Sequence, residues 1–270
     1  MIGQSNLLNN IDKIKNRFPR FSIIVGAEKS GKQTLCKEIS KLLNTEIFVS
    51  GIKIDEIRET IELSYNQSSP LIILFPNADN MSLGAKNSLL KITEEPPKNV
   101  YFILTLTSID NTLPTIKSRG TVFNLDNYTK DELIEYRKYR GYNQSNDDII
   151  SKICETTGDV DEIFSYNISE FYHFANYIAI HIHIPTSGNL FKITKFMKIK
   201  ESDNGYNTIL LLKTIQNLYK DLYKETKKSQ YLNAILTTSK SISELKLNSV
   251  SKLGTMDNWI MNVRRSLVGV

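Results

Sequence analysis

Residues 21–43 read FSIIVGAEKSGKQTLCKEISKLL, and this stretch decides the fold. The apolar run Phe21–Val25 is typical of a buried strand, and Leu35–Leu43 has the spacing of a helix. The segment Gly26–Lys32 between them has the G-x-x-x-x-G-K spacing of a phosphate-binding loop. A chance glycine-lysine turn is the alternative, but a strand before the loop and a helix after it are the context that the motif requires.

The loop keeps the residues that hold phosphates and has lost a metal ligand. Gly26 and Gly31 let backbone N–H groups approach phosphates, and Lys32 reaches the outer ones. The next residue, normally a Ser or Thr whose hydroxyl binds Mg²⁺, is Gln33. Thr34 has a hydroxyl, but one residue along a helix turns it by about 100° away from that position.

Composition is that of an ordinary soluble protein, and it limits the possible sites. The 270 residues are enough for two or three domains, and the only cysteines, Cys36 and Cys154, argue against a four-cysteine zinc site. Residues 1–170 hold 20 Lys and Arg against 23 Asp and Glu, whereas residues 171–270 hold 14 against 6. The basic last third is compatible with nucleic acid, an acidic partner or a solvated helical surface. With no membrane-spanning run and no signal-peptide pattern, a cytoplasmic location is expected.

The first 125 residues alternate between strand and helix patterns, which predicts a parallel sheet covered by helices. The expected strands are Ser22–Val25, Glu46–Val49, Leu71–Phe75, Tyr101–Leu106 and Thr121–Phe123, and the expected helices between them are Leu35–Leu43, Asp55–Ser64 and Ser82–Ile92. The loop at Gly26 and the turn Asn77–Asp79 follow strands, so both should lie at the ligand-binding edge of the sheet.

The rest of the chain is expected to be helical. The capping box Thr129–Glu132 opens a helix that Gly141 can close, Asp147–Thr157 reads as a helix stopped at Gly158, and Asp159–Tyr166 starts a third. From about Tyr172 onward the pattern is helical again, with Pro185–Leu190 expected as a loop.

The run LIILFPNADNMSLGAKNSLLKITEEPPKNVYFILTLTSIDNTLPTIKSRG, residues 71–120, resembles the delta-prime subunit of bacterial DNA polymerase III clamp loaders, within the AAA+ superfamily. The matching motifs are Ala78–Met81, Asn87–Lys91, Glu94–Pro97 and Leu113–Gly120, together with Ile2–Gln4 and Ile54–Arg58. The resemblance covers residues 1–125, weakens over the small helical unit and nearly vanishes over the last hundred residues. It is also compatible with a phage-encoded or otherwise divergent version.

Departures from the family pattern concern hydrolysis. The family's acidic pair falls on Pro76 and Asn77, and the arginine expected in the helical unit falls on Asp161. The polar residue that the family has after its sensor strand falls on Ser108, which is a tolerable change. The family's arginine finger falls on Arg119, and the cysteine that follows it in the family is Gly120 here. The family's zinc module is absent, so no zinc is expected.

The resemblance implies an α/β fold of three domains: a RecA-like AAA+ domain over residues 1–125, a helical lid over 126–172 and an all-helical collar over 173–270. It implies a heteromer with other clamp-loader subunits that acts on a sliding clamp and primed DNA, with no membrane. Arg119 would be an arginine finger acting in trans, and Lys86 would face DNA. ATP would bind weakly, if at all, through Gly26, Gly31, Lys32, Thr34 and Ser108, and no intrinsic ATPase is expected.

Other interpretations stay open. His181 and His183 are spaced like some metal ligands, but ordinary helix side chains are the simpler interpretation. Glu94 and Glu95 could suggest acid/base chemistry, although a solvated turn explains them as well. A weakly active ATPase using Asp79 and Thr34 as unconventional ligands, and a solitary AAA+-derived DNA-binding protein, are the alternative functions. Arg119 could also be a surface arginine that pairs with a local carboxylate.

Overall fold

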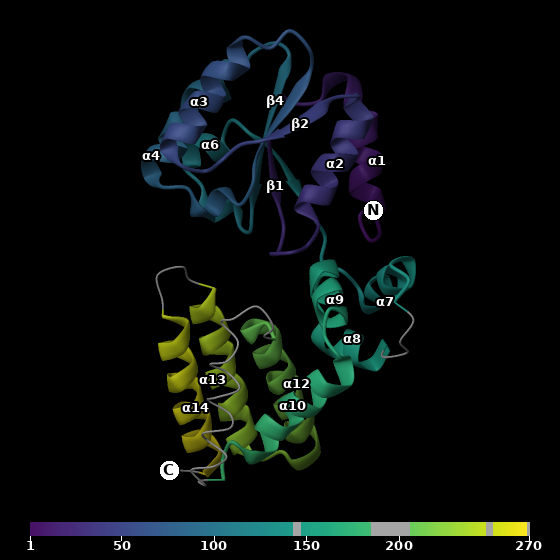
Figure 1. Ribbon diagram of the computed structural model, residues 1–270, viewed down its shortest axis with the longest axis vertical. Helices are drawn as coiled ribbons and strands as arrows, with labels where there is room; N and C mark the ends of the chain where they lie inside the picture. The colour runs from purple at the N-terminus through teal and green to yellow at the C-terminus, as the bar shows by residue number, and fades with distance from the viewer. Residues whose placement is uncertain (143–146, 185–205, 247–250, 269–270) are drawn as a thin grey trace. The chain divides into compact units, whose positions relative to one another are not determined.

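The computed structural model describes residues 1–142, 147–184, 206–246 and 251–268, and Figure 1 shows the elements in chain order. The chain divides into two compact units. The first holds residues 1–143 and 155–158, and the second holds residues 144–154 and 159–270. The division into domains at residues 125 and 172 stays a prediction. No helix among the described residues is long and apolar enough to span a bilayer.

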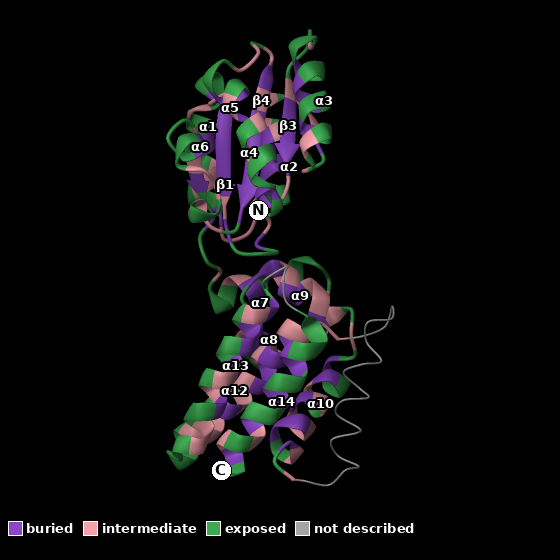
Figure 2. Cartoon of the chain, turned by 90° about the vertical axis from the view of Figure 1, so that its left-hand side faces the viewer, coloured by how far each residue is buried: buried purple, intermediate pink, exposed green. Residues whose placement is uncertain are grey.

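A parallel sheet of five strands forms the centre of the first unit, in the order β2-β3-β4-β1-β5. The strands are β1 (Phe21–Val25), β2 (Glu46–Val49), β3 (Leu71–Phe75), β4 (Val100–Leu106) and β5 (Thr121–Asn124), so the predicted strands are confirmed to within a residue at each end. The inner strands are buried, as the purple ribbons of Figure 2 show, because parallel sheets are covered on both faces.

Helices cover both faces of this sheet (Figure 1). One core joins the strands to α1 (Ser5–Lys13) and α2 (Lys32–Leu43), and the short η1 (Lys15–Arg17) follows α1 in the chain. The other core joins them to α3 (Ile54–Tyr65), η2 (Ala78–Asn80), α4 (Leu83–Ser88), α5 (Leu90–Glu94), η3 (Ile109–Asn111) and α6 (Pro114–Lys117). The predicted single helix Ser82–Ile92 is therefore wrong in detail. It is interrupted at Leu89, a fully buried residue between α4 and α5.

The helices that follow the sheet begin with α7 (Lys130–Tyr139), and the predicted capping box is confirmed. The Thr129 side chain accepts a hydrogen bond from the backbone N–H of Glu132, and the Glu132 carboxylate accepts one from the Thr129 N–H. The predicted helix Asp147–Thr157 is wrong beyond Ile153. The chain forms α8 (Asp147–Ile153) and then α9 (Thr157–Phe164), so Gly158 lies in the first turn of a helix instead of ending one.

Long helices pack against one another in sequence order in the second unit: α10 (Ile168–His181), α12 (Thr208–Thr226), α13 (Ser229–Leu245) and α14 (Lys252–Val268). Their apolar stripes form the core, as helical spacing predicts. The fully buried Trp259 donates its indole N–H to Thr238 at 3.0 Å, which satisfies the one polar atom of that ring. The loop expected at Pro185–Leu190 lies outside the described residues.

Candidate functional site

The glycine-rich loop connects the end of β1 to the start of α2, as the sequence predicts. Gly31 precedes the helix with φ of +92°, a conformation that is strained for residues with a side chain. Lys29 also has a positive φ of 60°. These two left-handed residues turn the chain sharply, so that the loop wraps around the N-terminus of α2.

Lys32 is turned back onto its own loop. Its Nζ atom donates hydrogen bonds of 2.7 Å to the carbonyl oxygens of Gly26 and Ala27, and the residue is only 7% exposed. Burial lowers the pKa of this ammonium group below its ordinary value, while the negative charges of Asp79 and Glu28 act in the opposite direction. The loop carbonyls thus satisfy the lysine, and a phosphate group would have to compete with them for its protons.

Two further contacts hold the loop, and residue spacing predicts neither of them. The Tyr128 hydroxyl donates to the carbonyl oxygen of Ser30 at 2.9 Å, and the Gly158 N–H donates to that of Lys29 at 3.2 Å. A Cβ atom at Gly158 would lie 2.4 Å from the Cβ of Lys29, so only glycine permits this approach. Neither contact belongs to a sequence motif. Both are made to backbone carbonyl oxygens of the loop by residues 98 or more positions away, so they depend on the tertiary fold and not on residue spacing.

Gln4, in the segment that resembles the family's opening motif, fixes the chain just after β5. Its buried amide group donates to the carbonyl oxygen of Asp126 at 2.9 Å and accepts from the Asp126 N–H at 3.0 Å. A side-chain amide that bonds both groups of one backbone residue defines its position closely. This pairing keeps the N-terminal segment beside the strand end.

A cavity of about 330 Å³ lies beside the loop. Gly31 and Thr34 line one part of it, and the rings of Tyr128, Tyr136 and Tyr139 line another. This volume falls within the range of small-molecule sites, and aromatic walls with a few polar groups are typical of them. Thr34 faces this cavity, so of the predicted nucleotide-site residues Gly31 and Thr34 are brought together here.

The residues at the positions of the expected Mg²⁺ ligands have few suitable oxygen atoms. Pro76 supplies no side-chain oxygen, and Asn77 adopts a left-handed conformation with φ of 49° in which its N–H donates to Thr105 at 2.9 Å. Gln33 is exposed at the start of α2. Within the described residues no group of three His, Cys, Asp or Glu side chains is arranged to hold a metal ion. This set of donors does not fit a nucleotide-bound Mg²⁺ ion.

Asp79, the alternative metal ligand, has a different task in the structure. Its carboxylate accepts hydrogen bonds from the Thr107 N–H at 2.9 and 3.0 Å, from the Thr107 hydroxyl at 2.7 Å and from the Asn111 amide at 2.8 Å. Burial raises the pKa of this carboxyl, but the bonds from Asn111 and Thr107 outweigh it and lower the pKa below its ordinary value. Asp79 therefore stays ionised and fixes the loop that follows β4.

Ser108 and Lys86 lie at this same loop. The Ser108 hydroxyl accepts from the Asp110 N–H at 3.3 Å and so caps η3, which leaves the sensor role of Ser108 a prediction. Lys86, on α4, donates from Nζ to the carbonyl oxygen of Asn111 at 2.6 Å. The lysine predicted to contact DNA is thus bonded to the Asp79 network in the isolated chain.

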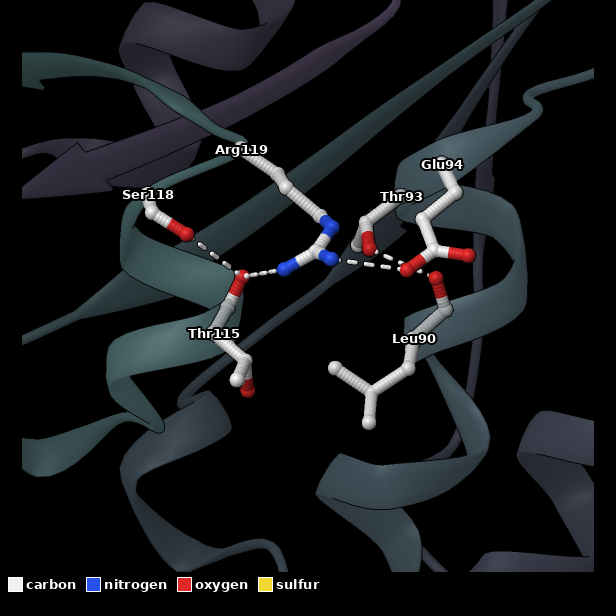
Figure 3. Close-up of polar contacts among 6 residues, drawn as sticks. All are labelled: Leu90, Thr93, Glu94, Thr115, Ser118 and Arg119. Atoms are coloured by element: carbon white, nitrogen blue, oxygen red, sulfur yellow. Dashed lines mark hydrogen bonds and ion pairs between the residues drawn. The ribbon is translucent and has the colours of Figure 1, made fainter.

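Arg119 follows α6, and Figure 3 shows its side chain reaching toward the end of α5. Its Nη1 donates to the carbonyl oxygen of Thr115 at 2.8 Å, and its Nη2 donates to Glu94 Oε1 at 2.7 Å. The two side chains of this ion pair are 35% and 56% exposed. The carboxylate partner that the sequence left open as an alternative therefore exists, and Glu94 is the residue that supplies it.

The remaining candidates have ordinary surroundings. His181 stacks on Tyr177 with ring centroids 4.3 Å apart, and its Nδ1 lies 2.9 Å from the Tyr177 carbonyl oxygen. His183 is exposed after the end of α10. Asp161, at the position where the family has an arginine, lies in α9 and is half-buried.

Comparisons with known proteins relate the chain to subunits of DNA polymerase III. A family described as DNA polymerase III, delta subunit, matches residues 9–129. A DNA polymerase III subunit delta′ from Buchnera aphidicola is 38% identical over 95 residues, which cover 34% of this chain and 28% of that protein. A subunit gamma from another Buchnera aphidicola strain is 32% identical over 39% of this chain and 31% of its own length.

These matches span about a third of the relatives' own length, although a second gamma subunit matches over 52% of its length at 26% identity. Within the matched region they confirm the resemblance to clamp-loader-type subunits of DNA polymerase III. The match ends at residue 129 and therefore includes the loop, the Asp79 network and Arg119.

Solved structures extend the likeness to the whole fold. A DNA polymerase III gamma subunit-related protein from Thermotoga maritima aligns with 97% of this chain and 99% of its own length, with a TM-score of 0.61 at 16% identity. The RuvB Holliday junction branch migration motor of the same organism aligns with 84% of this chain and 78% of its own length, with a TM-score of 0.51 at 16% identity. The predicted RecA-like AAA+ fold followed by C-terminal helices is confirmed.

Proposed function

We propose that this chain is a clamp-loader subunit of the delta-prime type, which helps to load a sliding clamp onto primed DNA. The observation that carries this proposal is a loop of phosphate-binding spacing with Gln33, Pro76 and Asn77 at the positions of the expected metal ligands, inside a region that matches the DNA polymerase III delta family. The complex that contains such a subunit hydrolyses ATP, but the subunit itself does not.

The lack of intrinsic hydrolysis follows from the donors around the loop. Hydrolysis of ATP requires a Mg²⁺ ion and a group that positions water, and the residues at the matching positions are Gln33, Pro76 and Asn77. Asp79 does not replace them, because its two oxygens already accept hydrogen bonds from Thr107 and Asn111. A weakly active ATPase is accordingly the less supported function.

Weak binding of a nucleotide remains part of the proposal. The loop amides at the N-terminus of α2 and Lys32 supply donors for phosphate, and the adjoining cavity is large enough for a nucleoside. Lys32 must first leave the carbonyl oxygens of Gly26 and Ala27, which lowers the affinity. We expect a nucleotide to bind weakly and with little help from Mg²⁺.

Arg119 is the main chemical contribution that we propose. It is 35% exposed and lies on a surface of the first unit, whereas Lys32 is buried in the loop of the same unit. An arginine beside the γ-phosphate of a neighbouring subunit would stabilise the charge that develops on the transferred phosphoryl group. Since this chain's own loop lacks the groups for hydrolysis, the arginine is of use only to a neighbour.

The long helices of the second unit are proposed to join neighbouring subunits, as a collar. Their cores are filled, yet several large apolar side chains remain exposed on α13 and α14, at Leu232, Leu236, Leu253, Met261 and Val268. Exposed apolar side chains on packed helices are typical of surfaces that bind other proteins. Arg119 belongs to the first unit and is not part of these helices.

Purification of the chain with its natural partners tests the proposal. A stable heteromer containing an active ATPase is expected, and the chain alone should show no ATP turnover above that of its Lys32→Ala variant. A chain that remains alone in the cell extract would favour the solitary DNA-binding protein. Robust turnover by the purified chain that Lys32→Ala abolishes would favour the ATPase.

A further inference from the structure

The ion pair of Arg119 joins two helix ends that are far apart in the sequence (Figure 3). Glu94 is the last residue of α5, and Arg119 comes two residues after α6 ends at Lys117. The Thr115 carbonyl oxygen accepts from Arg119 Nη1 at 2.8 Å and from the Ser118 hydroxyl at 3.1 Å. One carbonyl and one carboxylate thus hold two corners of the guanidinium group.

The end of α5 is itself well defined. The buried Thr93 donates its hydroxyl proton to the carbonyl oxygen of Leu90 at 2.7 Å, within the last turn of α5. This bond lies one residue before Glu94 in the chain. The carboxylate approaches Arg119 from the last residue of a helix.

The neighbouring glutamate makes no such contact. Glu95 is exposed, and in the part of the chain that the structure describes its carboxylate accepts no hydrogen bond and joins no ion pair. Only its backbone N–H is engaged, with the carbonyl oxygen of Lys91 at 3.1 Å. Two adjacent, exposed glutamates thus differ in their contact with Arg119, which only Glu94 makes among the described residues.

We propose that Glu94 is a positioning residue that holds Arg119 against its own chain until a phosphate group replaces the carboxylate. This inference rests on the proposed function of Arg119. The guanidinium group has five N–H donors and uses two of them here, on Thr115 and Glu94. A phosphoryl group carries more charge than a carboxylate and matches the same fork of donors, so it can displace Glu94.

The expected effect is modest, because both side chains are partly exposed and solvent weakens their attraction. Exposed ion pairs of this kind shift an equilibrium by about two- to fivefold. Glu94→Gln keeps the size of the side chain and removes its charge. In Glu94→Gln the equilibrium between Arg119 bound to its own chain and Arg119 free should shift about two- to fivefold toward the free side chain. Glu95→Gln should leave this equilibrium unchanged.

The first measurement examines Arg119 directly in the full chain, independently of any function. Modification by phenylglyoxal, followed by mass spectrometry of the peptide that contains Arg119, reports how freely this guanidinium group reacts. We expect modification to be about two- to fivefold faster in Glu94→Gln and unchanged in Glu95→Gln. Equal rates in Glu94→Gln and the unchanged chain would overturn the inference.

The second measurement uses the assembled complex. Glu94→Gln should raise its ATP turnover at low ATP concentration about two- to fivefold, and this gain should vanish in an Arg119→Ala background. If Arg119→Ala lowers turnover but Glu94→Gln does not change it, Glu94 does not compete with phosphate and the inference fails. If Arg119→Ala itself leaves turnover unchanged, the proposed function fails, and this result is distinct from the other two.

Discussion

Replacing Asp79 by Asn tests whether this residue builds the loop after β4 or serves as a metal ligand. Its carboxylate accepts from three donor groups on Thr107 and Asn111 at 2.7 to 3.0 Å. Hydrogen bonds to charged groups contribute about 1.5–3 kcal/mol each when shielded, but an asparagine keeps one acceptor oxygen and this site is partly open to solvent. We therefore expect the opening free energy of the loop to fall by about 1–2 kcal/mol.

Amide hydrogen exchange measures this directly, because the Thr107 N–H is itself one of the donors. The peptide that covers residues 107–111 should exchange about 5- to 30-fold faster in Asp79→Asn at pH 7. Asp126→Asn is the matched control, since the exposed Asp126 side chain makes no hydrogen bond among the described residues. Unchanged exchange would refute the network, and protection of this peptide by added Mg²⁺ would restore Asp79 as a metal ligand.

The same network predicts a pH dependence. The pKa of Asp79 lies below its ordinary value of about 3.9 in the folded chain, so its contribution to stability is fully present above that pH. It is lost as the pH falls through the lowered pKa. The difference in exchange between Asp79→Asn and the unchanged chain should therefore be constant from pH 5 to 7 and shrink below about pH 4.

Two further predictions concern the nucleotide and the assembly. Titration of the isolated chain with ATP should show weak binding, and adding Mg²⁺ should change the affinity less than about threefold, because Pro76 and Asn77 replace the acidic ligands. A large gain in affinity with Mg²⁺ would mean that another residue binds the metal. Leu236→Glu on α13, where the side chain is 60% exposed, should leave the fold intact but weaken assembly at least about tenfold, as burying a charge at an apolar interface does. Leu63→Glu on α3, whose side chain is also exposed but lies in the first unit, is the control, and assembly of Leu236→Glu as strong as that of Leu63→Glu would disprove the collar surface.

The sheet was predictable from the sequence because its strands are short apolar runs that end in turn residues. Burial on both faces leaves few alternatives to a parallel sheet for segments such as Ile72–Phe75 and Phe102–Leu106. The helix break at Leu89 was not predictable, because every residue around it is compatible with a helix. Gly158 was expected to end a helix, but it lies in the first turn of α9, where its close approach to Lys29 has no sequence signal.

The site was predictable in part for the same reasons. The loop and Arg119 belong to linear motifs: the loop connects β1 to α2, and Arg119 lies between α6 and β5. The partners of these residues lie far away in sequence: Glu94 is 25 residues from Arg119, and Asp79 is 28 residues from Thr107. Pairs of this kind depend on the sheet order and on helix packing, which residue spacing does not encode.

ATP turnover of the assembled complex carrying Arg119 variants is the measurement that tests the central claim most directly. Arginine fingers contribute roughly 10³–10⁵ to the rate at the site they serve, so Arg119→Ala should reduce the DNA- and clamp-stimulated turnover at that site by about 10³-fold or more. Arg119→Lys should rescue poorly, since a lysine lacks the planar fork, and Arg17→Ala, at another exposed arginine, should have no effect. Unchanged turnover in a complex shown to contain the Arg119→Ala subunit would contradict the account.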